Sequence, residues 1–194
     1  MKTDIYSFVF RGVLSEESLD QAGRKKYSTE EVFFSDDIEK KLHFNEINPV
    51  YLEQSKTMIT VFATITAFEN ATREFIYSIL KDNYGTEWWT KGVQEKIRKR
   101  AESRRNQETK VKWHVQRGDA LMSYLDFGDL PDIMLSGDNW NLFESYVDNQ
   151  SWVNGIFNDI SKSRNVIMHS GVLDEYDIIR VGLNIRDWLR QINA

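Results

Sequence analysis

The chain has 194 residues, a length that suits one domain with its own core, and its 41% hydrophobic and 13% aromatic content predicts a globular protein. It contains no cysteine, which excludes disulfides, thiolate metal sites and a cysteine nucleophile. No apolar signal region follows Met1 to Asp4, and no run approaches the roughly 18 apolar residues of a membrane span. The net charge of −5 alone argues against a nucleic-acid partner, so its distribution along the chain matters.

Residues 1–48 form a predicted N-terminal extension to a helical domain over residues 49–194. Ile5 to Phe10 combines β-branched and aromatic residues, which favours a short strand. Val32 to Phe34 suits either a second strand or part of a helix. A weak helical pattern follows over residues 36–42. The extension therefore has room for one or two short strands.

A long helix is predicted from Asn48 to the Tyr84-Gly85 pair. Asn48 is a suitable N-cap, Pro49 suits the first helical position, and Gly85 suits a helix terminator. Between these ends, apolar residues recur at helical spacing over the whole length. At 1.5 Å per residue, such a helix is about 50 Å long.

Two charged residues interrupt the apolar stripe of this long helix. Glu69 and Arg73 are four positions apart, so they share one helix face. As surface residues they would form an ion pair that contributes about 0.3 kcal/mol. As part of a functional site they would line a cleft. The residues alone leave both interpretations open.

Trp88 and Trp89 follow the long helix. Adjacent residues cannot share a helix face, so one indole is expected to pack inward and the other to cover a neighbouring helix or a partner. Base stacking by one of them is an alternative.

Residues 91–112 form a basic segment with nine lysines and arginines against three glutamates, a local charge of +6, so that the rest of the chain carries −11. Val93, Ile97 and Ala101 are spaced by four, which predicts a helix that buries only a narrow stripe. The segment is either a solvated helix face or a track for the phosphate backbone of a nucleic acid. The candidate nucleic-acid-binding residues are Lys96, Arg98, Lys99, Arg100, Arg104 and Arg105.

Short helical segments separated by turns are predicted over residues 120–125, 131–135 and 140–147. Asp129, Asp132 and Asp138 lie in this region without the spacing of metal ligands, so no metal site is predicted.

The next predicted helix, over residues 149–170, ends in the sequence Arg164-Asn-Val-Ile-Met-His169. Asn165 and His169 share a face, and the Arg164 side chain is long enough to swing back to it. An arginine fork matches phosphate oxygens, and an imidazole changes charge near neutral pH, so the cluster suits work on a phosphodiester. The alternative is a histidine that stabilises the helix dipole and an arginine at the surface. A last helix with a broad apolar stripe is predicted over residues 174–193.

Arg164-Asn-x-x-x-His169, with a polar residue directly after the arginine, resembles the R-x4-H motif of the HEPN family (higher eukaryotes and prokaryotes nucleotide-binding domains). Three further stretches resemble HEPN proteins from prokaryotic defence and RNA processing: Ala67 to Ile76, Tyr84 to Trp89, and Tyr124 to Leu130. They occur in the expected order, and with the motif helix they cover about residues 50–192.

The resemblance implies an all-α fold, a HEPN-like helical bundle behind the N-terminal extension. It also implies a metal-independent endoribonuclease with no cofactor, in which the RNA 2′-hydroxyl attacks the adjacent phosphate at the R-x4-H site of a homodimer. His169 would act as general base or acid, Arg164 would stabilise charge on the phosphate, and Asn165 would orient His169 or contact the phosphate. Glu69, Arg73 and Asn70 would complete the wall of the cleft.

The expected partners are RNA, a second copy of the chain, and an antitoxin or a defence-complex protein, with no membrane. We expect a cytoplasmic protein in prokaryotic defence or toxin action. The alternative is a HEPN module without catalysis, a dimerisation or RNA-binding scaffold. A nucleotide-binding helical domain has less support, because the sequence has no Gly-rich phosphate loop.

Overall fold

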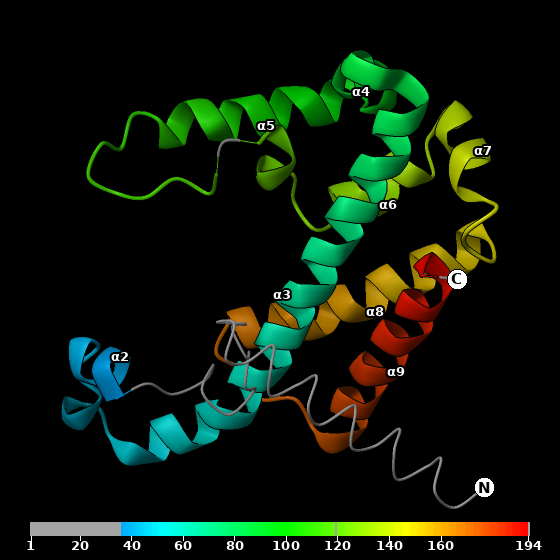
Figure 1. The fold of residues 1–194 in the computed structure, drawn as a ribbon. Helices are drawn as coiled ribbons and strands as arrows, with labels where there is room; N and C mark the ends of the chain where they lie inside the picture. The colour runs from blue at the N-terminus through cyan, green and yellow to red at the C-terminus, as the bar shows by residue number, and fades with distance from the viewer. Residues whose placement is uncertain (1–35, 119, 194) are drawn as a thin grey trace, which may run out of the picture. The chain divides into compact units, whose positions relative to one another are not determined.

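The computed structural model describes residues 36–118 and 120–193, and in these ranges the chain consists of helices joined by turns and loops, with no strand (Figure 1). The prediction of an all-α fold is confirmed for this part of the chain. The strands predicted in the N-terminal extension lie outside the described residues. No helix among the described residues is long and apolar enough to cross a membrane.

The chain divides into two compact units, residues 1–52 and 53–194. The described part of the first unit contains helix α2 (Asp36–Lys41) and the 3-10 turn η1 (Phe44–Glu46), which agrees with the helix predicted over residues 36–42. The predicted domain boundary, between the extension over residues 1–48 and the helical domain over residues 49–194, stays a prediction.

Helix α3 (Pro49–Tyr84) has the predicted bounds. The Asn48 side chain accepts a hydrogen bond from the Val50 N–H at 3.0 Å, as an N-cap does. The helix stops where Gly85 adopts a φ of +56°, a conformation that glycine reaches without steric cost. The short turn η2 (Gly85–Glu87) follows.

The basic segment differs from the single helix predicted from residue 91 onward. The structure has a short helix α4 (Trp88–Gly92), a break, and helix α5 (Glu95–Glu108). The break follows Gly92, where an added Cβ would lie 2.8 Å from Cδ2 of Leu80 on α3. A side chain at this position would push α4 off α3, so close packing against α3 explains the glycine.

The middle of the chain is a series of short turns and helices around a buried asparagine, Asn139. The elements are η3 (Leu121–Tyr124), α6 (Asp129–Met134), η4 (Gly137–Asn139) and α7 (Trp140–Phe143). The Asn139 amide donates to the carbonyls of Gly92 and Ile133 at 2.7 and 2.8 Å and accepts from the Tyr84 hydroxyl at 3.2 Å. One side chain therefore ties the end of α3 and of α4 to α6 and η4.

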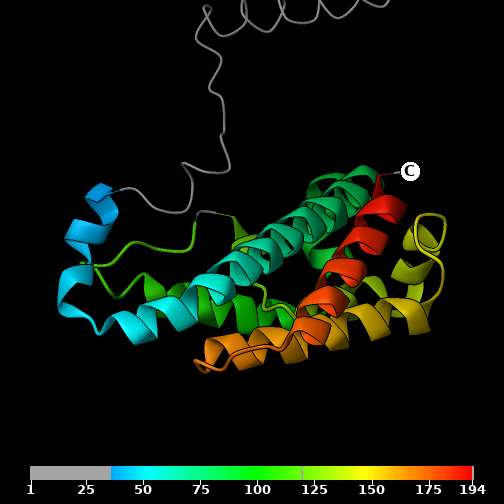
Figure 2. The same cartoon turned by 90° about the horizontal axis from the view of Figure 1, so that it is seen from below.

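Helices α8 (Gln150–Met168) and α9 (Glu175–Ile192) match the predicted last two helices. Asn149 caps the first by accepting from the Trp152 N–H at 2.9 Å, and Asp174 caps the second by accepting from the Asp177 N–H at 2.8 Å. Figures 1 and 2 show both helices packed against α3.

An aromatic cluster joins α3, α8 and α9. The Phe68 ring of α3 lies 5.6 Å from Phe157 of α8 and 6.0 Å from Trp188 of α9, measured between ring centroids. Phe127, from the turn before α6, lies 6.1 Å from Phe68 and 5.3 Å from Phe157. All four side chains are buried. Each such aromatic pair contributes about 1 kcal/mol beyond the burial of its surface, so this cluster fixes how the three helices meet.

We predict that Asn139→Ala lowers the free energy of unfolding by about 3 kcal/mol, because it leaves two buried carbonyls and a hydroxyl without their partner. Urea unfolding followed by circular dichroism measures the loss. Asn158→Ala, at an exposed position of α8, is the matched control and should change stability by less than about 0.5 kcal/mol. Equal stability of the Asn139 variant and the wild type would contradict the role of this side chain.

Candidate functional site

The centre of the candidate site is the Glu69 carboxylate of α3, which lies between two guanidinium groups. Its Oε1 accepts from the Arg73 Nη2 at 2.5 Å, and its Oε2 lies 3.7 Å from the Arg164 Nε of α8. The Glu69 side chain is 12% exposed, Arg73 17% and Arg164 32%. The structure therefore brings the predicted residues Glu69, Arg73 and Arg164 together from two helices.

The chain segment around Leu125 and Phe127 forms one wall of this cluster. Arg73 Nη2 also donates to the Leu125 carbonyl at 2.7 Å, and the Arg164 guanidinium lies 5.9 Å from the centroid of the Phe127 ring. Arg164 therefore has the Phe127 ring on one side and, at ion-pair distance but beyond hydrogen-bond distance, the Glu69 carboxylate. Arg164 is thus the looser of the two cations.

The Glu69 cluster carries an excess of positive charge, since one carboxylate faces two guanidinium groups. A planar guanidinium presents a fork of N–H donors that fits the oxygens of a phosphate. Arg164 is more exposed than Arg73 and makes the weaker contact with Glu69, so Arg164 is the group that a bound anion can engage.

His169 lies one residue beyond the end of α8 and forms its C-cap. After it, Ser170 adopts a left-handed φ of +61°, and the N–H groups of Ser170 and Gly171 donate to the Ile167 and Val166 carbonyls at 3.0 and 2.8 Å. This is a Schellman motif, with the serine as the left-handed residue, and it ends the helix within two residues of the predicted end at residue 170.

The motif residues Asn165 and His169 point away from the core, and both are exposed. The imidazole of His169 makes no hydrogen bond or ion pair within residues 36–118 and 120–193. Asn70 of α3 is exposed as well. The structure thus does not join these three side chains to the Glu69 cluster by direct contact, and their predicted roles stay predictions.

The direction of α8 places His169 relative to α3. Arg164 contacts Glu69, whereas the Leu173 N–H, beyond the end of α8, donates to the Met58 sulfur at 3.3 Å. The end of α8 therefore points toward the N-terminal half of α3, as Figure 1 also shows. His169 lies on the Met58 side of Arg164.

Most of the candidate cations of α5 are engaged within the protein. Arg100 pairs with Asp129, and Arg104 pairs with both Asp126 and Asp129 while donating to the Tyr124 carbonyl at 2.8 Å. These contacts attach α5 to the turn before α6, and they serve the fold whether or not the helix also contacts RNA.

Four further cations of this helix differ in their partners. Arg98 donates to the Thr90 carbonyl at 2.7 Å, and Lys99 pairs with Glu95 at 2.6 Å. Lys96 and Arg105 are exposed, and neither pairs with a carboxylate among the residues that the structure describes. Of the six candidate nucleic-acid-binding residues, four are therefore engaged within the protein, whereas Lys96 and Arg105 remain available to bind an anion.

A cavity of about 590 Å³ adjoins Arg73 on the side away from Arg164. No single sequence motif predicts this cavity, because its walls come from four separate elements. Its one detectable signal is the spacing of four that puts Arg73 and Tyr77 on one face of α3. The lining residues are Asn70, Arg73, Glu74 and Tyr77 of α3, Trp88 of α4, Arg105 of α5, and residues 120–123.

The two adjacent tryptophans have different environments. Trp88 lines the cavity, and its ring meets Tyr77 edge to face at 5.1 Å. Trp89 donates from its indole Nε1 to Glu102 of α5 at 3.3 Å. Trp89 therefore covers a neighbouring helix, as predicted for one of the pair, while Trp88 is half-buried against the core and lines the cavity.

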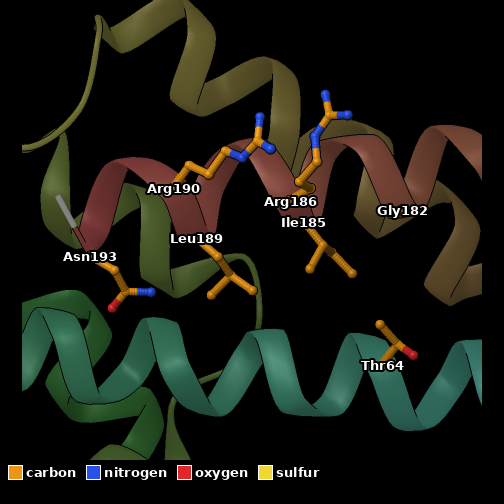
Figure 3. A pocket seen from close by; sticks show the side chains of 7 residues that line it. All are labelled: Thr64, Gly182, Ile185, Arg186, Leu189, Arg190 and Asn193. Atoms are coloured by element: carbon orange, nitrogen blue, oxygen red, sulfur yellow. The ribbon is translucent and has the colours of Figure 1, made fainter. Parts of the chain in front are cut away.

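A second hollow of about 680 Å³ lies between α3 and α9. Figure 3 shows Ile185 and Leu189 pointing toward α3 opposite Thr64, while the guanidinium groups of Arg186 and Arg190 point away from it. The lining is mainly aliphatic, and none of the predicted site residues lies in it.

Residues 64–193 match the model of a protein family described as Swt1-like HEPN. The match covers more than half of the chain and includes the Glu69 cluster, the R-x4-H residues and the cavity beside Arg73. It confirms the resemblance of the chain to the HEPN family. Neither the curated proteins nor the solved structures include a significant match.

We predict that Glu69→Gln lowers the free energy of unfolding by about 2 kcal/mol, because it leaves the mostly buried Arg73 guanidinium without its anion. The matched control is Asp126→Asn, which removes a carboxylate that is 55% exposed and should cost less than about 1 kcal/mol. Thermal and urea unfolding of both variants measure the difference. Equal losses would contradict a central role for Glu69.

Proposed function

Because the chain belongs to the Swt1-like HEPN family, we propose that it is an endoribonuclease that cleaves RNA without a metal ion at its R-x4-H site. The observation that supports this most is the placement of Arg164 beside Glu69 and Arg73, with the exposed His169 at the end of the same helix. A cation with spare N–H donors and a free imidazole are the two groups that phosphodiester cleavage by an internal hydroxyl needs.

In the proposed reaction the ribose 2′-oxygen forms a bond to phosphorus as the bond to the 5′-oxygen breaks. His169 acts as general base for the 2′-hydroxyl proton or as general acid for the leaving 5′-oxygen. The products are a 2′,3′-cyclic phosphate and a 5′-hydroxyl. A homodimer brings two such imidazoles to one cleft, so that one can accept a proton while the other donates one.

Arg164 stabilises the negative charge that builds up on the phosphate oxygens in this reaction. Its 3.7 Å contact with Glu69 is loose enough to be exchanged for a contact with phosphate. Arg73 keeps its 2.5 Å contact with Glu69, so the carboxylate stays paired when Arg164 turns to the substrate. Asn165, on the same face as His169, orients the imidazole or contacts the phosphate, and Asn70 completes the wall from α3.

Homodimerisation is part of the proposal, and exposed apolar side chains near the motif support it. These side chains lie between residues 166 and 183, on the last turn of α8, the connection and one face of α9. Their exposed fractions range from 39% to 77%, which is unusual for a group of large apolar residues. They are Val166, Met168, Val172, Tyr176, Ile179 and Leu183.

The second candidate function is an RNA-binding or dimerising scaffold without catalysis. One observation favours it: within the described residues, nothing hydrogen-bonds to the His169 imidazole and fixes its orientation. A catalytic imidazole is usually held by such a partner, which here would have to come from a second subunit or from the substrate. Both the nuclease and the scaffold are compatible with a role in defence or toxin action, with an antitoxin or another partner in the cytoplasm.

We predict that Arg164→Ala lowers the rate of RNA cleavage by at least about 10²-fold, because it removes a donor that stabilises the transition state. His169→Ala should reduce cleavage at least as strongly. Cleavage of a mixed RNA pool is measured with a chelator present, followed by analysis of the new ends for cyclic phosphates and 5′-hydroxyls. The control is Lys162→Ala, which removes an exposed cation of the same helix and should leave the rate nearly unchanged.

Wild-type rates in the Arg164 or His169 variant would refute the assigned roles. RNA binding with no cleavage by the wild-type dimer would favour the scaffold.

We also predict that Tyr176→Glu converts a dimer into a monomer, because it places a charge in the proposed apolar interface. Light scattering gives the mass, and the cleavage assay should show a parallel loss of activity. Asn158→Glu, which adds a charge at an exposed position of α8 outside residues 166–183, is the control. A Tyr176 variant that keeps the mass of the wild-type dimer would place the interface elsewhere.

A further inference from the structure

The cavity beside Arg73 has two aromatic side chains set at a right angle. The rings of Tyr77 and Trp88 are 5.1 Å apart between centroids, with an angle of 89° between their planes. Tyr77 is 39% exposed and Trp88 is half-buried, so both rings are accessible. In such a corner a flat ligand can stack on the face of one ring while its edge meets the other.

Polar groups surround this aromatic corner. Asn70 and Glu74 of α3 and Ser123 of η3 line the same cavity, so an amide, a carboxylate and a hydroxyl face its interior. These groups both donate and accept hydrogen bonds. The edge of a nucleobase has donors and acceptors of this kind, whereas a purely aliphatic ligand would leave the polar groups without partners.

Arg105 adds a cation at the rim of the cavity. Its neighbours Arg98, Arg100 and Arg104 are held by carbonyls or carboxylates of the protein. Arg105 has no carboxylate partner among the described residues, although it lies on the same helix. An arginine that lacks an internal anion and borders an aromatic pocket is suited to a phosphate of the ligand in that pocket.

Arg73 connects the cavity with the Glu69 cluster. It lines the cavity, and its Nε is buried and has no hydrogen-bond partner among the described residues. Glu69, Arg73 and Tyr77 follow one another at intervals of four residues, so they form a column on one face of α3. The column spans about 12 Å, at 1.5 Å per residue, a length that a few nucleotides cover.

The two ends of this column differ in chemistry. Toward the N-terminal half of α3 lie Arg164 and, beyond it, His169. Toward the C-terminal half lie Tyr77, Trp88 and Arg105. A strand of RNA that follows α3 therefore meets the cleavage groups first and the aromatic cavity within a few nucleotides.

We propose that this cavity binds one unpaired base of single-stranded RNA, a few nucleotides from the phosphate that is cleaved. The base stacks on Tyr77 or Trp88, its edge meets Asn70, Glu74 or Ser123, and Arg105 contacts a phosphate next to it. The inference rests on the proposed nuclease function for its substrate. It assigns the cavity a role in substrate choice, because only a base outside a duplex can enter it.

The test uses full-length His169→Ala protein, so that RNA binding is measured without cleavage. The probes are short single-stranded homopolymers of each of the four bases, a duplex of the same length, and the free mononucleotides. Each adenine probe is also made with one 2-aminopurine, whose fluorescence is quenched when it stacks on an aromatic ring. Affinity is measured by fluorescence anisotropy at fixed salt.

At least one single-stranded homopolymer should bind more tightly than both the duplex and the mononucleotide, with quenching of 2-aminopurine. Tyr77→Ala should weaken this binding by about tenfold or more and remove the quenching, since stacking of one base contributes that much. Tyr77→Phe, which keeps the ring, should restore both. Arg105→Ala should weaken binding and lower its dependence on salt, whereas Lys91→Ala, an exposed cation on α4 paired with Glu87, should do neither.

The inference is overturned if no homopolymer binds, or if Tyr77→Ala and Arg105→Ala bind RNA as the parent does. It is also overturned if the mononucleotide binds as tightly as the strand, since the cavity would then be a site for free nucleotides. The two proposals fail separately. If the wild type cleaves RNA but the Tyr77 and Arg105 variants bind it as the parent does, the nuclease proposal stands and the base-binding role of the cavity is refuted. If RNA binding depends on Tyr77 but the wild type does not cleave, the base-binding role stands and the nuclease proposal is refuted.

Discussion

The packing of Phe68 against Phe157 and Trp188 is the constraint on which the rest of the domain depends. Phe68 directly precedes Glu69 on α3, and Phe157 lies seven residues, or two turns, before Arg164 on α8. The aromatic contacts thus set the crossing of α3 and α8, and with it the distance between carboxylate and guanidinium. A polar cluster of this kind has too little interaction energy to position two helices, so the apolar core must do so.

The buried carboxylate of Asp129 has a comparable effect on α5. It is 5% exposed and holds Arg100 and Arg104, which fixes the face that a strongly basic helix turns toward the protein. The neighbouring Arg105 is consequently directed to the rim of the cavity, beside residues 120–123. Charge on α5 is therefore divided between holding the fold and lining the cavity, which explains how an acidic chain can present a basic edge.

Local signals were sufficient for the long elements. Asn48, Pro49 and Gly85 predicted the ends of α3, and apolar spacing predicted α8 and α9, because these signals lie within the helix itself. The break after Gly92 was not predicted, and the close approach that explains the glycine is to Leu80 of another helix, which no local pattern shows. The same limit applies to the site. The spacing of four predicted that Glu69 and Arg73 share a helix face, but only the folded chain brings Arg164 to them. In the same way, no local pattern reveals that Asp129 forms ion pairs with Arg100 and Arg104.

The position of Glu69 has a consequence for turnover. In the proposed reaction, a phosphate that binds Arg164 competes with a carboxylate that is already beside it, so the net gain in free energy is smaller than the full strength of an arginine–phosphate pair. Glu69 thus competes with the phosphate for Arg164, and because it belongs to the same chain it is always present beside that arginine. For the proposed nuclease, this competition limits the affinity for the cleaved strand as much as for the intact one, and so favours the release of product.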